Sequence, residues 1–249
     1  MKFESMPSGT PLPKENTLPL RVGESKKGPE HGDYTLWKVV AQDPEGLGKM
    51  IALKQVKREE FATPEAMRTD KEFYEFLKSF PDFGKFLPGT MYFKAQMTKD
   101  AAPQFFRLQR FIEGRAVDRM TDDELYCDPA VVRQLLELID GALEILRAAR
   151  EAKKLMPDFR HAIESNESLR TKIRGLLSDP RYSGNIFVSE KPDESGQRVF
   201  FVDTGPNAKD RTRKGHEIFV REISSRIGET SFKHWKKELE KALKNAPKD

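Results

Sequence analysis

Cysteine is almost absent from this sequence: Cys127 is the only one among 249 residues. A disulfide within the chain is therefore excluded, and a thiolate metal site is not expected. The sequence also has no apolar run close to the roughly 20 residues that a membrane helix needs, and Met1 to Ser5 lack the apolar core of a secretory signal. We therefore expect a soluble protein that works in a reducing compartment, with a cytoplasmic location and no membrane partner.

A strong charge of one sign is missing as well. The net charge of +4 suits a ligand that carries phosphate, but it is too small to predict nucleic-acid binding. Apolar residues make up 37% of the chain, and 17 phenylalanines supply much of the expected core. With 249 residues, the chain is long enough for one large domain or for two lobes that share a cleft.

The first part of the chain is predicted to be a flexible leader followed by a sheet. Residues 1–17 are rich in proline, serine and glycine, and such a leader would also suit a protein delivered elsewhere, such as a secreted effector. Behind it, apolar runs predict antiparallel strands at residues 18–22, 34–41, 49–56, 90–95 and 104–111. The loop at residues 23–32 contains Gly23, Gly28 and Gly32 and is expected to form a flexible lip between the first two strands.

Lys54 lies between two apolar residues on one face of a predicted strand, an unusual place for a charge unless a partner neutralises it. A helix predicted to begin at Thr63-Pro64 supplies carboxylates. Glu72 borders the apolar stripe of this helix, whereas Glu75 lies almost opposite it. Glu72 is therefore the first choice to face Lys54, and Glu75 is the reserve.

From residue 113 onward the pattern becomes mostly helical. Apolar residues at helical spacing predict helices at residues 129–155, 167–177, 217–227 and 231–246. We therefore expect an α+β protein of two lobes. The N-lobe is a β-sheet with one helix at residues 18–112, and the C-lobe is mostly helical at residues 113–249.

Within the helical part, two short apolar runs flank a polar turn and predict an antiparallel hairpin. One strand begins just after Asn185 and the other ends on Asp203, so the hairpin brings these two side chains to the same end. Amide and carboxylate oxygens are hard ligands that suit Mg²⁺, which completes its shell with water and phosphate oxygens. The sequence therefore indicates phosphoryl chemistry.

These parts, in this order, resemble the protein-kinase-like superfamily, especially compact members such as aminoglycoside and choline phosphotransferases. Ile51-Ala52-Leu53-Lys54 resembles the strand whose lysine contacts the nucleotide phosphates, and Glu72 resembles the family's ion-pair glutamate. Residues 109–115 resemble the interlobe segment, whose backbone groups take the adenine. Residues 184–188 resemble the end of the catalytic loop, and residues 202–205 resemble the metal-binding aspartate motif.

The resemblance implies ATP and Mg²⁺ as cofactors and transfer of the γ-phosphate to a hydroxyl of a protein or small molecule. The residues implied to contact phosphates or adenine are Lys54, Gly23, Gly28, Gly32, Arg110 and Ile112. Glu72 would hold Lys54 in place, and Asn185 and Asp203 would hold the metal ion. The resemblance indicates neither the phosphoacceptor nor the oligomeric state.

The sequence departs from the family at the catalytic base. The family has an aspartate five residues before the asparagine, whereas this sequence has Pro180 there and Asp179 one residue earlier, after an insertion at residues 156–178. Either the loop bulges so that Asp179 serves as the base, or the base is missing. The first alternative predicts a working phosphotransferase, and the second predicts a pseudokinase that acts as a nucleotide- or protein-binding scaffold.

The Asp203-Thr204-Gly205 tripeptide is also how aspartic proteases present a carboxylate. Such a protease needs a long β-rich stretch after the motif, whereas residues 206–249 are predicted to be helical. We therefore reject the protease class.

Overall fold

The computed structural model describes residues 4–5, 26–31, 34–42, 48–56, 63–96, 104–151, 181, 183–202 and 217–245. These residues form an α+β protein, which confirms the predicted class. The chain divides into two compact units, of which the first comprises Met1–Lys71 and Pro88–Phe111 and the second comprises Glu72–Leu87 and Ile112–Asp249. The lobe boundaries expected from the sequence stay a prediction, and the segments expected at residues 18–22 and 167–177 lie outside the described residues.

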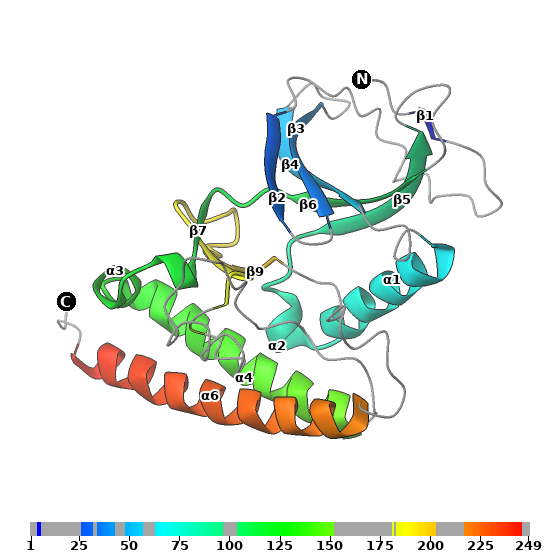
Figure 1. The fold of residues 1–249 in the computed structure, drawn as a ribbon. Helices are drawn as coiled ribbons and strands as arrows, with labels where there is room; N and C mark the ends of the chain where they lie inside the picture. The colour runs from blue at the N-terminus through cyan, green and yellow to red at the C-terminus, as the bar shows by residue number, and fades with distance from the viewer. Residues whose placement is uncertain are drawn as a thin grey trace. The chain divides into compact units, whose positions relative to one another are not determined.

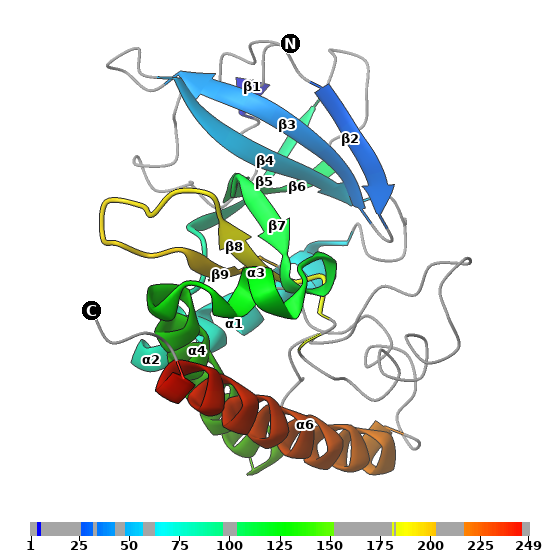
Figure 2. The ribbon, with the colours of Figure 1, turned by 90° about the vertical axis from the view of Figure 1, so that its left-hand side faces the viewer.

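The first unit contains a six-stranded antiparallel sheet with the order β1-β5-β6-β4-β3-β2 (Figure 2). Its strands are β1 Glu4–Ser5, β2 Lys26–His31, β3 Tyr34–Gln42, β4 Gly48–Val56, β5 Thr90–Gln96 and β6 Gln104–Arg110. The last four confirm the strands predicted from the apolar runs, each with one end displaced by a single residue. β4, which carries Lys54, lies between β3 and β6, so its backbone is hydrogen-bonded on both sides.

The prediction of a glycine loop at residues 23–32 is wrong over residues 26–31, because this segment forms strand β2. Its pairing with β3 shifts register between Lys27 and Glu30, where Gly28 and Pro29 lie. Proline has no N–H to donate, so a proline in a strand is tolerated at a sheet edge or in a bulge. β2 is an edge strand of this sheet and has such an irregularity.

Helix α1, Pro64–Lys78, confirms the helix predicted after Thr63. The helix begins with Pro64 and has Glu65 in its first turn and Lys78 in its last, the charges that suit the two ends of a helix dipole. A short helix, α2 Pro81–Gly84, follows it.

The second unit is built on two long helices, α4 Pro129–Glu151 and α6 Glu217–Asn245, which lie side by side (Figure 1). They run antiparallel, because Glu229 of α6 pairs with Arg150 near the end of α4, whereas Lys236 pairs with Asp140 in the middle of α4. α4 confirms the predicted helix over residues 129–151. A short helix, α3 Asp122–Tyr126, and a 3₁₀ turn, η3 Val117–Arg119, precede α4.

The two final helices expected at residues 217–227 and 231–246 are one helix in the structure. Gly228 lies between the two expected segments, and glycine disfavours a helix by about 1 kcal/mol relative to alanine. Gly228 is instead buried at the α4–α6 contact, where a methyl group in its place would meet Leu146 at 3.7 Å. The buried residues Phe232, Trp235 and Leu239 continue the same helix, so packing against α4 outweighs the local preference.

A three-stranded antiparallel sheet, with the order β7-β8-β9, completes the second unit. Its strands are β7 Gly114–Ala116, β8 Ile186–Ser189 and β9 Val199–Phe201. The β8–β9 pair confirms the predicted hairpin, but β7 lies where a linker and then helices were expected. Position 114 requires glycine, because the Cβ atom of any other residue would lie only 2.1 Å from the Val188 carbonyl oxygen. Among the helices that the structure describes, none is long and apolar enough to span a membrane.

The two buried glycines of the α4–α6 layer should respond oppositely to alanine. A Cβ atom at Gly141 would lie 2.9 Å from the Cβ atom of Phe83 and 3.0 Å from its backbone nitrogen, so Gly141→Ala forces α2 away and should destabilise the protein. Gly228→Ala meets only an ordinary contact at 3.7 Å and should raise the free energy of unfolding by about 0.5–1 kcal/mol. Urea unfolding of both variants measures this, and a loss of stability in Gly228→Ala would contradict the packing described for α6.

The ion pairs of Glu229 predict a pH dependence of stability. Its side chain is 16% exposed and lies 2.8 Å from Lys233 Nζ and 3.3 Å from Arg150 Nη1. Hydrogen bonds from Lys233 and then Arg150 hold the pKa of Glu229 below its usual value. The ionised carboxylate therefore stabilises the folded state above the unfolded pKa of about 4.3, and this contribution is lost as the pH falls through the folded pKa.

Glu229→Gln should accordingly lower the free energy of unfolding at pH 7, and its difference from the wild type should shrink as the pH falls below about 4.3. The measurement is urea unfolding between pH 7 and pH 3. Glu240→Gln, at an exposed position of the same helix, is the matched control and should follow the wild type. A difference that stays constant over the whole pH range would show that the ion pairs do not supply the stability.

Candidate functional site

The open end of the β8–β9 hairpin brings Asn185 next to the residue that precedes Asp203. The last strand pair is Ile186 with Phe201. One residue further, the Val202 N–H donates to the Asn185 carbonyl oxygen at 2.8 Å, and the Asn185 N–H donates to Ser183 Oγ at 3.2 Å. Asn185 is half-buried. The structure thus places Asn185 at the hairpin end where the chain continues to Asp203, which itself lies outside the described residues.

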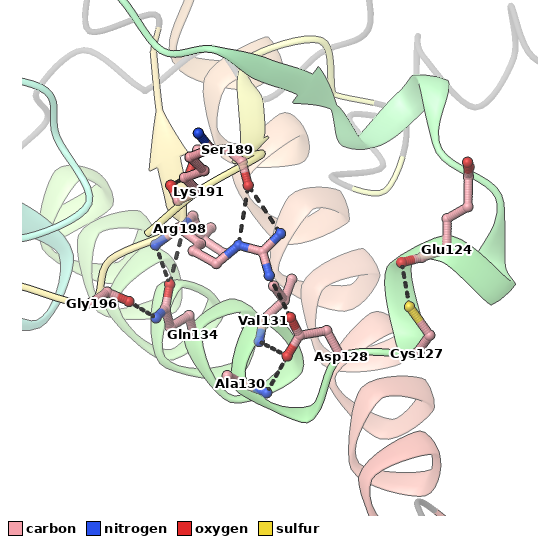
Figure 3. Close-up of polar contacts among 11 residues, drawn as sticks. Glu124, Cys127, Asp128, Ala130, Val131, Gln134, Ser189, Lys191, Gly196 and Arg198 are labelled. Carbon is pink, nitrogen blue, oxygen red and sulfur yellow. Dashed lines mark hydrogen bonds and ion pairs between the residues drawn. The ribbon is translucent and has the colours of Figure 1, made fainter. Parts of the chain in front are cut away.

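Gln134 of α4 holds the outer edge of β9 (Figure 3). Its side-chain oxygen accepts from the N–H groups of Arg198 and Val199 at 2.8 and 3.1 Å, and its amide nitrogen donates to the Gly196 carbonyl oxygen at 2.9 Å. Two residues along β9, the Phe201 N–H donates to the Phe86 carbonyl oxygen at 2.9 Å. An edge strand otherwise leaves such groups without partners, so these bonds seat the hairpin on the helices.

Arg198 fixes both the hairpin and the start of α4. Its guanidinium pairs with Asp128 and also donates from Nε and Nη2 to the Ser189 carbonyl oxygen, both at 3.1 Å (Figure 3). Asp128 in turn accepts from the Ala130 N–H at 2.9 Å, so it caps the first turn of α4. One arginine therefore joins β8, β9 and the helix N-terminus.

The tripeptide Asp82-Phe83-Gly84 has the letters of the protein-kinase metal motif, but the structure gives it another role. It forms helix α2, where Asp82 is exposed and Phe83 is fully buried. The Phe83 ring packs on Phe201 of β9 with 5.5 Å between ring centroids. This segment therefore packs against the hairpin through the Phe83 side chain, and it is not a second candidate for the metal site.

A carboxylate that the sequence analysis did not single out lies close to the open end of the hairpin. Asp118 of η3 has its Oδ2 atom 3.6 Å from the position that a Cβ atom would take at Gly184, the residue before Asn185. The short η3 segment has no periodic pattern, so the sequence carried no signal for this proximity.

In the first unit, Lys54 occupies the middle of the sheet. Position 54 pairs with Leu36 of β3 and with Arg107 of β6. The Lys54 side chain is outside the described part of the structure. Glu72 lies on α1 with its side chain exposed and belongs to the second compact unit, and its pairing with Lys54 stays a prediction.

The segment expected to contact adenine is partly committed to other hydrogen bonds. The Arg110 N–H donates to the Gly89 carbonyl oxygen at 3.1 Å, and the Glu113 carbonyl oxygen accepts from the Glu190 N–H at 2.9 Å. Arg110 is exposed, and Ile112 is 8% exposed. An adenine ring would therefore need backbone groups of this segment other than the Arg110 N–H.

Of the other predicted site residues, Asp179, Gly23 and Gly32 lie outside the described residues, and Gly28 lies in β2. Arg181, two residues after Asp179, is described. Its Nη1 atom lies 2.8 Å from Glu238 Oε2 of α6, so this point of the chain is tied to the last helix. Despite partial burial, the pKa of Arg181 is raised by the Glu238 carboxylate.

Of the two residues expected to bind magnesium, only Asn185 lies among the described residues. Mg²⁺ takes oxygen ligands, commonly one or two carboxylates together with substrate phosphates, and the side chain of Asn185 carries an amide oxygen, which is of this kind. Within the described ranges, no three His, Cys, Asp or Glu side chains gather as a metal-binding group.

No known family profile matches the sequence, and no curated protein matches it significantly. Among solved structures, the chain is similar to a MAP kinase from Leishmania major, with 13% sequence identity and a TM-score of 0.38 over 86% of this chain. The match spans 56% of that kinase, so this chain corresponds to just over half of its length. A likeness with this TM-score does not assign a fold, and the kinase-like fold stays a prediction.

The hydrogen bonds that Gln134 makes to the hairpin can be tested directly. Gln134→Ala leaves the N–H groups of Arg198 and Val199 without their acceptor, and Val199 is fully buried. Buried donors that lose a partner cost about 1–3 kcal/mol each, so the free energy of unfolding should fall by about that amount. Hydrogen exchange at the Val199 amide should accelerate in step. Arg133→Ala, at the exposed neighbouring position of α4, is the control, and equal exchange rates in both variants would contradict the role of Gln134.

Proposed function

We propose that this protein is an ATP- and Mg²⁺-dependent phosphotransferase of the kinase-like type, which transfers the γ-phosphate of ATP to a hydroxyl of a protein or small molecule. The observation that carries the proposal is the 2.8 Å hydrogen bond between the Asn185 carbonyl oxygen and the Val202 N–H. This backbone bond supports the proposal because Asn185 stands at the open end of the hairpin, and Asp203 is the residue that follows Val202.

The position of Lys54 supports the same function. It lies on a strand that is paired on both sides, and this limits backbone motion around it. In the proposed reaction its ammonium group neutralises charge on the α and β phosphates, as lysines on such strands do in kinases.

The remaining roles follow from the chemistry of each side chain. Asn185 and Asp203 bind the metal ion, which offsets negative charge on the transferring group. Asp179 accepts the proton of the acceptor hydroxyl and so orients the nucleophile. Phosphoryl transfer depends mainly on positioning and charge neutralisation, so the seating of the hairpin by Gln134 and Arg198 is part of the proposed mechanism.

A second candidate function is favoured by one observation. Pro180 occupies the place of the base, five residues before Asn185. If Asp179 does not take that place, the protein binds nucleotide but transfers phosphate slowly, and it then acts as a nucleotide- or protein-binding scaffold.

The two functions are separated by measuring transfer from γ-labelled ATP together with thermal stability. ATP with Mg²⁺ should raise the melting temperature of the wild type, because ligand binds the folded state alone. Asp203→Ala should lose both this shift and the transfer. Asp179→Asn should keep the shift and lose transfer by about 10²–10⁴-fold.

Glu194→Ala is the matched control, because this exposed carboxylate lies in the turn at the other end of the hairpin. It should behave as the wild type in both measurements. A wild type that shows the thermal shift but no transfer supports the scaffold function. A wild type that shows neither would contradict both candidates.

A further inference from the structure

Arg181 is held by the last helix through an ion pair. Its Nη1 atom lies 2.8 Å from Glu238 Oε2, and the two side chains are 23% and 36% exposed. The other oxygen of the same carboxylate, Oε1, lies 3.7 Å from Nδ1 of His234, an exposed residue one turn earlier on α6. One oxygen of Glu238 thus pairs with Arg181, while the other faces a side chain of its own helix.

Buried groups lie beside this ion pair. The hydroxyl of Tyr126, on α3, is buried, and burial raises the pKa of this hydroxyl above its usual value. The charges of Asp122, Arg181 and Glu238 all act on the same hydroxyl, so the pair lies close to it. Trp235, one turn before Glu238 on α6, is 1% exposed. An ion pair that is partly buried is screened less by water and salt than one on the open surface.

The segment that begins at Arg181 ends at the proposed metal ligand. Ser183, two residues after Arg181, is fully buried, and its Oγ accepts from the Asn185 N–H at 3.2 Å. The Asn185 carbonyl oxygen accepts in turn from the Val202 N–H at 2.8 Å. Residues 181–185 thus run from a contact with α6 to the open end of the hairpin.

The same two long helices hold the hairpin itself. α6 packs on α4, and Gln134 and Arg198 fix the turn end of the hairpin on α4. The ion pair of Arg181 adds an attachment to α6 at the start of residues 181–185. Asp179 lies two residues before Arg181, a span of at most about 7 Å in an extended chain. The ion pair therefore limits how far Asp179 can lie from α6.

We propose that the Arg181–Glu238 ion pair positions the segment from Asp179 to Asn185 for phosphoryl transfer. Arg181 is a positioning residue, because it acts on the reaction through the two side chains at the ends of this segment. Breaking the pair releases the segment from α6 and displaces both the proposed base and the proposed metal ligand. This inference rests on the proposed function, since it gives Arg181 a part in the same reaction.

Hydrogen exchange tests the attachment without any use of activity. Arg181→Met should accelerate exchange at the Asn185 amide at least about twofold, because the segment is no longer attached to α6. Exchange at the Val199 amide should stay unchanged, because α4 holds that amide independently. Glu238→Gln should have the same effect as Arg181→Met. The charge swap, Arg181→Glu with Glu238→Arg, restores an ion pair and should bring the exchange rate at Asn185 back toward the wild type.

Lys236→Met is the matched control, because it breaks another ion pair of α6, the one with Asp140 of α4. It should leave exchange at both the Asn185 and the Val199 amides unchanged. Circular dichroism of every variant confirms that it is folded.

Transfer from γ-labelled ATP tests the positioning role. Arg181→Met should lower kcat at least about tenfold, since small displacements of reacting groups are costly. It should raise KM for Mg²⁺-ATP by a smaller factor, because Lys54 and the segment expected to contact adenine are not altered. Arg181→Lys keeps the cation and the charge swap keeps the pair, so both should recover part of the lost kcat. Lys236→Met should transfer phosphate as the wild type does.

Each outcome decides the inference. Faster exchange at Asn185 but not at Val199, with a kcat that falls in Arg181→Met and recovers in the charge swap, supports it. Unchanged exchange at Asn185, equal acceleration at Val199, or a kcat that does not depend on the pair overturns it. A wild type that transfers no phosphate contradicts the proposed function and overturns the role of the pair in the reaction, whereas the exchange rates still decide whether the pair attaches the segment to α6.

Discussion

The hydrogen bonds between Gln134 and the outer edge of β9 are the constraint on which the proposed site depends. A three-residue strand at the edge of a small sheet is marginal by itself. Gln134 supplies the acceptor for the N–H groups of Val199, the first residue of β9, and of Arg198 just before it, and the Arg198 side chain ties the same hairpin to Asp128 at the start of α4. Gln134 and Arg198 thus fix the turn end of the hairpin on α4, and the hydrogen bond from the Phe201 N–H to the Phe86 carbonyl oxygen fixes β9 near the end that carries Asn185.

The sequence predicted the strands and helices where periodicity was strong, as in α4 and β3. It failed where tertiary packing overrides a local preference: two helices were expected on either side of residues 228–230, but burial of Gly228 against Leu146 accompanies one continuous helix, α6. It also placed a loop at Gly28, because it could not show that β2 is an edge strand. For the site, the hairpin pattern located Asn185, whereas Asp118 comes close to Gly184 only through a contact between distant parts of the chain.

The central claim is that the open end of the β8–β9 hairpin binds the metal ion of a nucleotide. Paramagnetic broadening of backbone amide resonances by Mn²⁺-ATP, with Mg²⁺-ATP as the diamagnetic reference, measures this most directly. The turn at Ser195 and Gly196 lies at the far end of β8, whose four residues span about 14 Å at the usual rise per residue. Our account predicts that the amides of Asn185 and Val202 broaden first and that those of the turn persist. Equal broadening at both ends, or broadening that does not require ATP, would contradict it.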